Sequence, residues 1–254
     1  MSEQPETGLG GELRVLPIAG LPEIEEGAPL GELIGERAEV RTGDVVVIAQ
    51  KIVSKAEGRL RRLSSVIPGA EARKLAAVLG KEPALVELVL EESSEVLRAE
   101  GGVLIVETLH GFVCANAGID SSNLPEGDTV CLLPEDPDAS ARRIRDELPV
   151  TPVGIVISDS FGRAWRLGQA EVAIGCAGLQ PLDDWRGRHD AHGRELEATL
   201  IAVADEAAAA ADLIRGKDSR VPAVVLRGLE RFVTAADGPG ARALRRPRSD
   251  DLFR

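Results

Sequence analysis

The sequence predicts a mixed α/β or α+β fold with two lobes. Short β-branched runs typical of buried strands alternate with segments of helical periodicity, but without the regular strand–helix–strand order of a parallel sheet. One pair of predicted strands flanks His110 and Gly111 as a hairpin and is therefore antiparallel. With 254 residues the chain can form one large domain or two small ones, and it can bury most of its apolar surface without covalent or metal staples.

The N-terminal half is predicted to contain two strands and three helices. Residues 1–12 are rich in Gly and Glu, which indicates a flexible terminus before a folded region at 13–254. Apolar alternation, β-branched runs and helical spacing then predict the elements in order. They are a strand at Leu13–Ile18, a helix in 28–38, a buried strand at Asp44–Ala49, and two helices within 68–97, broken at Gly80–Pro83, with Leu85, Leu88, Val89 and Val96 on one face.

The C-terminal half continues with the hairpin, two helices and two strands. Asp136 beside Pro137 is a typical helix start, and Gly216 is a typical helix stop. The predicted elements are hairpin strands at Val103–Val106 and Phe112–Ala117, a helix at Asp136–Leu148, a strand at Val153–Ile157, an Ala-rich helix late in 195–215, and a strand at Val221–Leu226.

The composition excludes several classes of function. Lys and Arg number 30 against 42 Asp and Glu, so the formal charge is −12 and a basic nucleic-acid binder is excluded. Four Phe, two Trp and no Tyr leave little for a base-stacking surface. The three cysteines form no CxxC pair. The first residues lack a secretory pattern and no apolar run reaches about 18 residues, so a cytoplasmic protein without membrane partners is expected.

Two scarce residue types gather in short segments. The chain has five Lys, of which Lys51 and Lys55 lie together, and its two Asn, Asn116 and Asn123, lie seven positions apart. Lys55 follows a buried strand, at the sheet edge where open α/β sheets bind ligands. There it could hold a phosphate as a point charge, although a solvated surface lysine is an equally good interpretation.

Two further segments offer oxygen ligands for a hard cation. Asp120, with Ser121, Ser122 and Asn123, suits Mg²⁺ or Mn²⁺, while the plain alternative is an Asx turn. Asp159 ends an apolar strand and Ser160 adds a hydroxyl, a common way to hold a metal; the plain alternative is a helix cap.

Arg163 and Arg166 lie three positions apart on whatever turn or helix follows that strand, where they could contact phosphate or substrate oxygens or be surface arginines. A third cluster, His189 and His192 with Asp183, Asp184 and Asp190, is interpreted as a polar loop.

Two strand-end aspartates, a lysine and an arginine pair together predict an enzyme that uses a metal and phosphate. The metal would neutralise the phosphates while the basic side chains stabilise the charge that moves in the transition state. The chain lacks GxSxG and lacks GxGxxG after a strand, so a serine hydrolase or a hydride-transfer enzyme lacks its expected parts.

At these segments the sequence resembles the coenzyme F-420 γ-glutamyl ligase family. The resemblance runs from about Val15 to Leu229 and includes GDVVVIAQKIVSKAEGR, GFVCANAGIDSSN, LLPEDPDASA, ISDSFGRAWRLGQAEVAIGCAGL and VPAVVLRGL, in order. It implies a two-lobed ligase domain with mixed sheets that forms an intertwined homodimer. It also implies a GTP-dependent amide ligase that adds L-glutamate to the deazaflavin precursor F-420-0 through an acyl phosphate, and then a γ-linked glutamate to F-420-1.

The resemblance also implies which residues bind metal and which contact the nucleotide. Similar proteins use Mg²⁺ or Mn²⁺, with two divalent ions expected, and are helped by K⁺. Metal ligands fall on Asp120, Asp159 and Ser160, and the residues expected to act in catalysis are Lys55, Asp120 and Asp159. Nucleotide contacts fall on Leu21, Pro22, Glu23, Ile24, Gln50, Lys51, Lys55 and Asn123, and on Gly216 and Lys217 within the loop Leu213–Ser219.

Two departures from archaeal members of the family concern this site. They have a carboxylate where this chain has Lys217, and hydroxyl residues where Gln50 and Lys51 stand, so contacts to a second metal and to the nucleotide are expected to differ. Two other functions stay open: another nucleotide-dependent carboxylate–amine ligase on the same scaffold, or a GTP-binding module without catalysis. For an acidic protein with anionic substrates, a small local cluster of bases is expected at the site, formed by Lys51, Lys55, Arg163 and Arg166.

Overall fold

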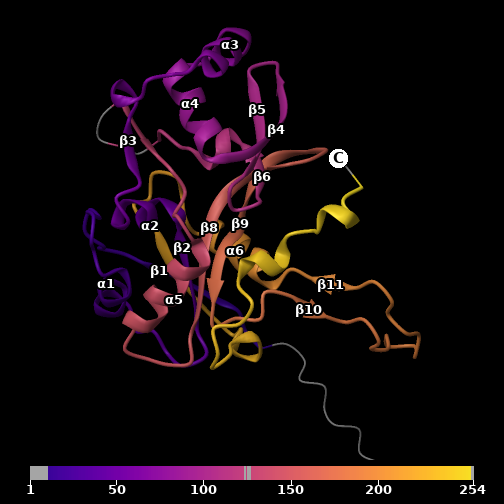
Figure 1. The fold of residues 1–254 in the computed structure, drawn as a ribbon. Helices are drawn as coiled ribbons and strands as arrows, with labels where there is room; N and C mark the ends of the chain where they lie inside the picture. The colour runs from indigo at the N-terminus through magenta and orange to yellow at the C-terminus, as the bar shows by residue number, and fades with distance from the viewer. Residues whose placement is uncertain (1–10, 123, 125–126, 253–254) are drawn as a thin grey trace, which may run out of the picture.

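A computed structural model describes residues 11–122, 124 and 127–252 of the chain; residues 1–10 of the predicted flexible terminus lie outside that part. Its larger lobe is built on a five-stranded sheet (Figure 1). Only the pair β2–β8 at the centre is parallel, and every other pair in this sheet is antiparallel. The strand order is β1 (Arg14–Ile18), β12 (Ala223–Arg227), β2 (Val45–Ala49), β8 (Gly154–Arg163) and β9 (Arg166–Ala177).

Helices cover both faces of this sheet because its central strands are apolar on both faces. Val46 and Ile48 point into one core, whereas Val45 and Val47 point into the other. The first core is closed by helices α1 (Leu30–Arg37), α2 (Gln50–Ala56) and α5 (Pro137–Glu147), and the second by α6 (Val203–Asp212). Helix α5 begins where predicted, since the Asp136 side chain accepts a hydrogen bond from the Ala139 amide.

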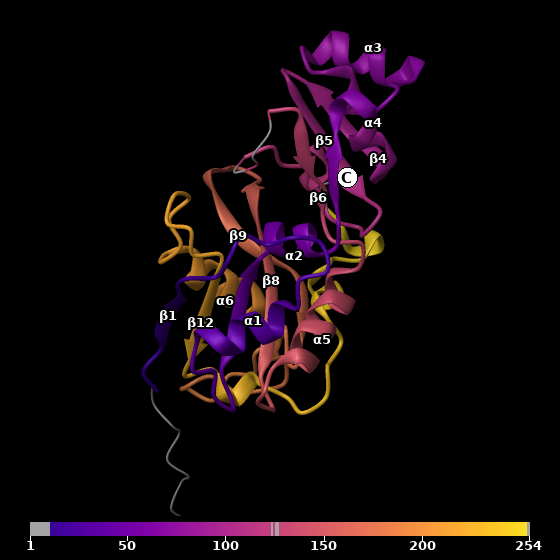
Figure 2. The same ribbon diagram turned by 90° about the vertical axis from the view of Figure 1, so that its left-hand side faces the viewer.

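The smaller lobe has its own hydrophobic core and lies above the sheet (Figures 1 and 2). Helices α3 (Ala70–Leu79) and α4 (Pro83–Glu91) pack on an antiparallel sheet of β4 (Ser93–Glu100), β5 (Val103–Thr108) and β6 (Val113–Ala115). A two-stranded ladder of β3 (Leu60–Arg62) and β7 (Thr129–Cys131) leads into and out of this lobe. The predicted α+β class with mixed sheets is thereby confirmed.

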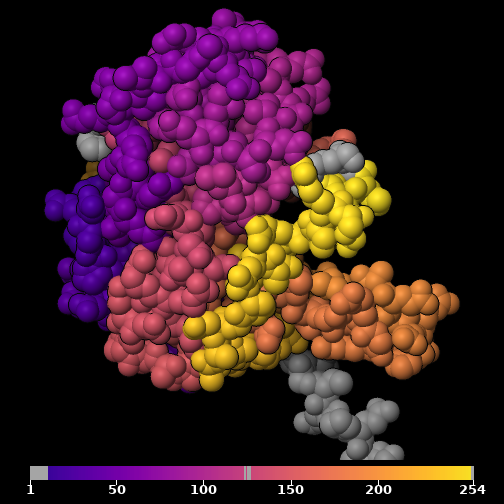
Figure 3. All heavy atoms as spheres, in the orientation of Figure 1, coloured from indigo at the N-terminus to yellow at the C-terminus, as the bar shows by residue number. Residues whose placement is uncertain are grey.

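Two segments extend beyond the lobes. An arm with β10 (Asp183–Asp184) and β11 (Leu200–Ile201) projects from the larger lobe, and the C-terminal segment crosses to the smaller lobe (Figure 3). There Arg245 donates to the carbonyl of His110, and Arg248 pairs with Glu95 and Glu107. Short 3₁₀ turns occupy Leu63–Ser65, Asn116–Gly118, Glu230–Phe232, Ala241–Leu244 and Arg248–Asp250. Within the described ranges, no helix has the length and apolar character needed to cross a bilayer.

The structure corrects the predicted elements in two places. Residues 93–97, predicted as helix, belong to strand β4, because they pair with β5 instead of continuing α4. The strand predicted to end at Ile157 continues through Arg163, and a twelve-residue strand that the sequence analysis did not anticipate, β9, returns beside it. The other predicted strands and helices are present, with ends that shift by a few residues.

Candidate active site

A cleft of about 1060 Å³ opens where β2 ends and its parallel pairing with β8 stops, at Ala49 and Ser158. Segments distant in sequence form its walls: the loop after β1, the start of α2, the loop that carries Asp120, the middle of the β8–β9 hairpin, and the loop after α6. Asn123 lies outside the described residues. The cleft is lined by every other residue predicted to bind nucleotide or metal, namely Leu21, Pro22, Glu23, Ile24, Gln50, Lys51, Lys55, Asp120, Asp159, Ser160, Gly216 and Lys217.

Asp120 and Lys51 form an ion pair that joins the smaller lobe to the larger one. The Lys51 Nζ lies 2.7 Å from Oδ2 of Asp120 and also donates to the carbonyl and the hydroxyl of Ser122. Burial on its own would raise the pKa of Asp120, but the hydrogen bonds from Lys51 and Ser122 outweigh burial and lower that pKa below its ordinary value. Asp120 is therefore an anion at neutral pH.

The pKa of Asp159 is shifted in the opposite direction from that of Asp120. Burial, together with the negative charges of Glu171 and Asp120, raises its pKa to about 7, against the opposing effects of the Ser160 amide and Lys217. A divalent cation between Asp120 and Asp159 would favour the ionised carboxylate. Among the described residues no three His, Cys, Asp or Glu side chains gather into a complete metal site. Two carboxylates nevertheless fit Mg²⁺, which typically takes one or two, with substrate phosphates and water completing its shell.

We expect the metal-free protein to lose stability as the pH rises from about 4 to about 7, because of Asp159. Below its ordinary pKa of 3.8 the carboxyl is protonated in both the folded and the unfolded state. At higher pH the folded state keeps a proton that the unfolded state has lost, so stability falls until both are ionised above about 7.

Urea unfolding in EDTA at pH 5 and pH 8 measures this fall in stability, which should be smaller in Asp159→Asn. Equal falls in the two proteins would contradict the assignment to Asp159.

Lys55 reaches the cleft from helix α2, one turn after Lys51. Its Nζ forms an ion pair with the exposed carboxylate of Glu23, while the rest of the side chain is mostly buried. An incoming phosphate would thus compete with a solvated carboxylate for this ammonium group. Gln50, at the start of the helix, is buried and accepts a hydrogen bond from Ser54.

Two buried charged residues of this cleft were not named as site residues: Glu171, which lies outside every predicted strand and helix, and Arg215, which lies within the predicted loop Leu213–Ser219. Glu171, on β9, is 6% exposed and accepts hydrogen bonds from Ser160 and from Arg215. Arg215, 8% exposed, also donates to the Ser158 hydroxyl. An acidic residue inside an otherwise apolar run, AEVAIGCA, was the available signal for Glu171, but it requires recognising β9 as a strand.

Arg163 and Arg166 do not line the cleft. Both lie at the exposed end of the β8–β9 hairpin instead of on the turn or helix predicted to follow the strand. The Arg163 guanidinium donates to the carbonyls of Leu167 and Gly168 and so closes its own hairpin. The bases that line the cleft are instead Lys51, Lys55, Arg215, Lys217 and Arg220.

The polar cluster of the arm is only partly the predicted loop: His189, Asp190 and His192 lie in the loop of the arm, whereas Asp183 and Asp184 form the short strand β10. Asp183 accepts a hydrogen bond from the Trp185 indole, and Asp184 pairs with Arg186, which lowers the pKa of Asp184 to about 2. The backbones of His189 and Glu195 form an isolated antiparallel β-bridge across the same loop.

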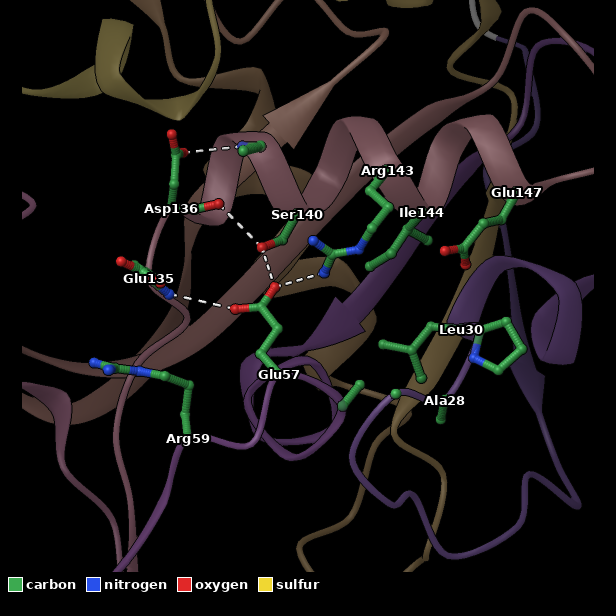
Figure 4. A pocket seen from close by; sticks show the side chains of 14 residues that line it. Ala28, Leu30, Glu57, Arg59, Glu135, Asp136, Ser140, Arg143, Ile144 and Glu147 are labelled. Atoms are coloured by element: carbon green, nitrogen blue, oxygen red, sulfur yellow. Dashed lines mark hydrogen bonds and ion pairs between the residues drawn. The ribbon is translucent and has the colours of Figure 1, made fainter.

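A second cavity, of about 590 Å³, lies between α1, α2 and α5 (Figure 4). Its central carboxylate, Glu57, accepts hydrogen bonds from Ser140, Arg143 and the Glu135 amide. None of the residues predicted to bind substrate, nucleotide or metal lines it. The first cleft is therefore the better candidate for the active site.

Fold and cleft together define a class: a two-lobed α+β protein whose polar cleft combines two neighbouring acidic side chains, Asp120 and Asp159, with several bases. Residues 20–228 match the family model of F-420-0:gamma-glutamyl ligase, and the chain belongs to this family. The predicted family and the predicted ligase class are thereby confirmed.

Relatives named coenzyme F-420:L-glutamate ligase match over most of their length. The protein of Methanopyrus kandleri is 44% identical over 247 residues, covering 95% of this chain and 98% of that protein. The protein of Methanothermobacter thermautotrophicus is 44% identical over 253 residues, with coverage of 95% and 99%. The protein of Archaeoglobus fulgidus is 47% identical over 221 residues, with coverage of 85% and 88%.

Proposed function

We propose that this protein is a GTP-dependent ligase that adds L-glutamate to F-420-0 and then a γ-linked glutamate to F-420-1. The observation that carries the proposal, beside family membership, is the gathering of Lys51, Lys55, Asp120 and Asp159 in one cleft. A carboxylate–amine ligase needs bases for the phosphates of its nucleotide and carboxylates for the accompanying cation, and the cleft offers both.

The proposed reaction has two steps. The terminal carboxylate of F-420-0 attacks the γ-phosphorus of GTP, which forms an acyl phosphate and releases GDP. The amine of glutamate then attacks the acyl carbon, loses a proton and displaces inorganic phosphate, leaving an amide. In both steps Lys55 and Lys51 would hold phosphate oxygens and stabilise the charge on the group in transfer.

Asp120 and Asp159 would hold Mg²⁺ or Mn²⁺, which when bound neutralises phosphate charge. Because Asp120 also accepts from Lys51, the ion pair would fix the carboxylate in position across the two lobes. Assistance by K⁺ and an intertwined homodimer are further parts of the proposal, taken from the resemblance. Assays with K⁺ replaced by Na⁺ test the former, and light scattering of the purified chain tests the latter.

A single coupled assay tests nucleotide, acceptor and reaction type together. The protein is incubated with F-420-0, Mn²⁺, GTP or ATP, and glutamate or another amino acid, and product mass and nucleoside diphosphate release are followed. The proposal predicts one and then two added glutamates, with GTP only. A product with ATP or another amino acid would favour a different ligase on this scaffold, and GTP binding without product would favour a binding module.

Lys55→Ala is expected to lower kcat/KM for GTP by roughly 10- to 100-fold, as expected for one hydrogen bond to a charged group worth about 1.5–3 kcal/mol. Steady-state GDP release measures the effect. Lys74→Ala, at an exposed lysine of α3 outside the cleft, is the matched control and should behave as wild type. Unchanged kinetics in Lys55→Ala would return this residue to the role of a surface lysine.

A further inference from the structure

One corner of the cleft contains two cationic side chains around Ser160 and Glu171. Lys217 Nζ donates to the Ser160 hydroxyl at 2.6 Å and lies 3.8 Å from Oε1 of Glu171. Arg215 Nη2 lies 2.9 Å from the other carboxylate oxygen, Oε2. Ser160 and Glu171 face each other across the β8–β9 pair, so the backbone register fixes their contact.

These contacts conflict with the second divalent ion that the resemblance implies. A cation bound by Ser160 would lie about 2.1 Å from its oxygen, next to an ammonium group that already bonds the same atom. Glu171, the nearest further carboxylate, is buried and already neutralised by Arg215, so its charge does not call for a metal. On the other side of the cleft Asp120 is also paired, with Lys51. Its neighbour Asp159 has no ion pair among the described residues, so a cation there would balance a carboxylate that no basic side chain neutralises.

We propose that this chain holds one divalent cation, on Asp120 and Asp159, and that Lys217 and Arg215 take the place of a second. The inference rests on the proposed function for the cation itself, and it goes beyond that function in assigning these two residues. Ser160 then serves as a hydrogen-bonded contact of Lys217 instead of a metal ligand.

One nitrogen of the Arg215 guanidinium makes none of the hydrogen bonds described above. Its Nη1 is buried and has no hydrogen-bond partner among the described residues, although a buried donor normally finds one. Arg215 lines the cleft beside Ser158 and Lys217. We infer that this guanidinium, together with the Lys217 ammonium, presents positive charge to anionic groups in the cleft, which is the electrostatic task that a second cation would perform.

Counting bound Mn²⁺ tests the proposal directly. The full chain, with and without GDP, is titrated with Mn²⁺, and the electron paramagnetic resonance signal of free Mn²⁺ gives the number bound per chain. Wild type is expected to bind one ion tightly, and Asp159→Asn should bind it at least about tenfold more weakly. Lys217→Glu, which exchanges the ammonium for a carboxylate beside Ser160, is expected to bind two ions with a spin-coupled signal.

Lys217→Gln is the matched control, since it removes the charge without adding a ligand, and it should still bind one ion. Two tight ions in wild type, none in wild type, or a single ion in Lys217→Glu would each overturn the proposal. The count requires no turnover, so it is separable from the proposed function. Glutamate addition by a protein with two bound ions would overturn this inference alone, whereas one bound ion without product would overturn only the proposed function.

Discussion

Asp159→Asn is expected to lower the kcat of glutamate addition by roughly 10²- to 10³-fold or more, the scale at which loss of one preorganised electrostatic contact acts in the transition state. The substitution keeps the size of the side chain and removes the negative charge that would hold the cation. Because β9 pairs with β8 at Asp159 and β2 pairs with β8 up to the preceding residue, Ser158, no rearrangement of the backbone is expected. GDP release and product mass at saturating Mn²⁺ measure the loss.

Stability distinguishes a lost metal ligand from a damaged fold. The environment of Asp159 disfavours its charge, so Asp159→Asn without metal at pH 8 should be at least as stable as wild type toward urea. Asp205→Asn is a matched control: Asp205 is a carboxyl in α6 whose pKa burial raises, it accepts a hydrogen bond from Ala173, and it is outside the cleft. That control should retain wild-type turnover. Near-normal turnover in Asp159→Asn would exclude its proposed role.

Arg215→Met is expected to destabilise the fold by about 3–5 kcal/mol, the usual cost of leaving one member of a buried ion pair without its partner. The variant leaves the Glu171 carboxylate, which is 6% exposed, with only its hydrogen bond from Ser160 and its longer contact with Lys217, and it removes the donor to the Ser158 hydroxyl. Urea unfolding at pH 7.5, followed by circular dichroism, gives the change in the free energy of unfolding.

The double variant Glu171→Met, Arg215→Met separates the ion pair from simple packing. Replacing both charges with apolar side chains of similar volume is often neutral for stability, so the double variant should recover most of the loss of Arg215→Met. Additive losses in the two single variants and the double variant would show that the pair does not act as a unit. The double variant should still be impaired in ligation, since Arg215 lines the cleft and the variant removes its positive charge.

The parts of the site that could be predicted are those with a local signal. Asp159 and Lys55 follow β-branched runs that read as buried strands, and parallel strands bring their carboxyl ends to one edge. Asp120 stands in a short segment of oxygen and amide side chains. The family resemblance added the apolar and backbone contacts at residues 21–24, which carry no chemical signal of their own.

The parts that could not be predicted depend on partners distant in sequence. Val96 continues the apolar spacing of α4, but pairing with Val106 of β5 places it in a strand. Strand β9 begins after a tight hairpin turn in which Trp165 adopts a φ of 58°. Gly or Asn usually occupies such a position and would have indicated the turn in the sequence. Once β9 is missed, Glu171 and its pairing with Arg215 cannot be seen, and Arg163 is assigned to the wrong kind of element.

The order of strands in the central sheet has a consequence for folding during synthesis on the ribosome. Strand β2 pairs with β8 and β12, so Val45 can pair only after Gly154 and Leu226 have been synthesised. Strand β1 likewise can pair only after β12 has been synthesised. The helices and hairpin of the smaller lobe make mostly local contacts and are able to fold while the rest is still being synthesised. The cleft has walls that come from residues between Leu21 and Pro222, so it can be completed only after most of the chain has been synthesised.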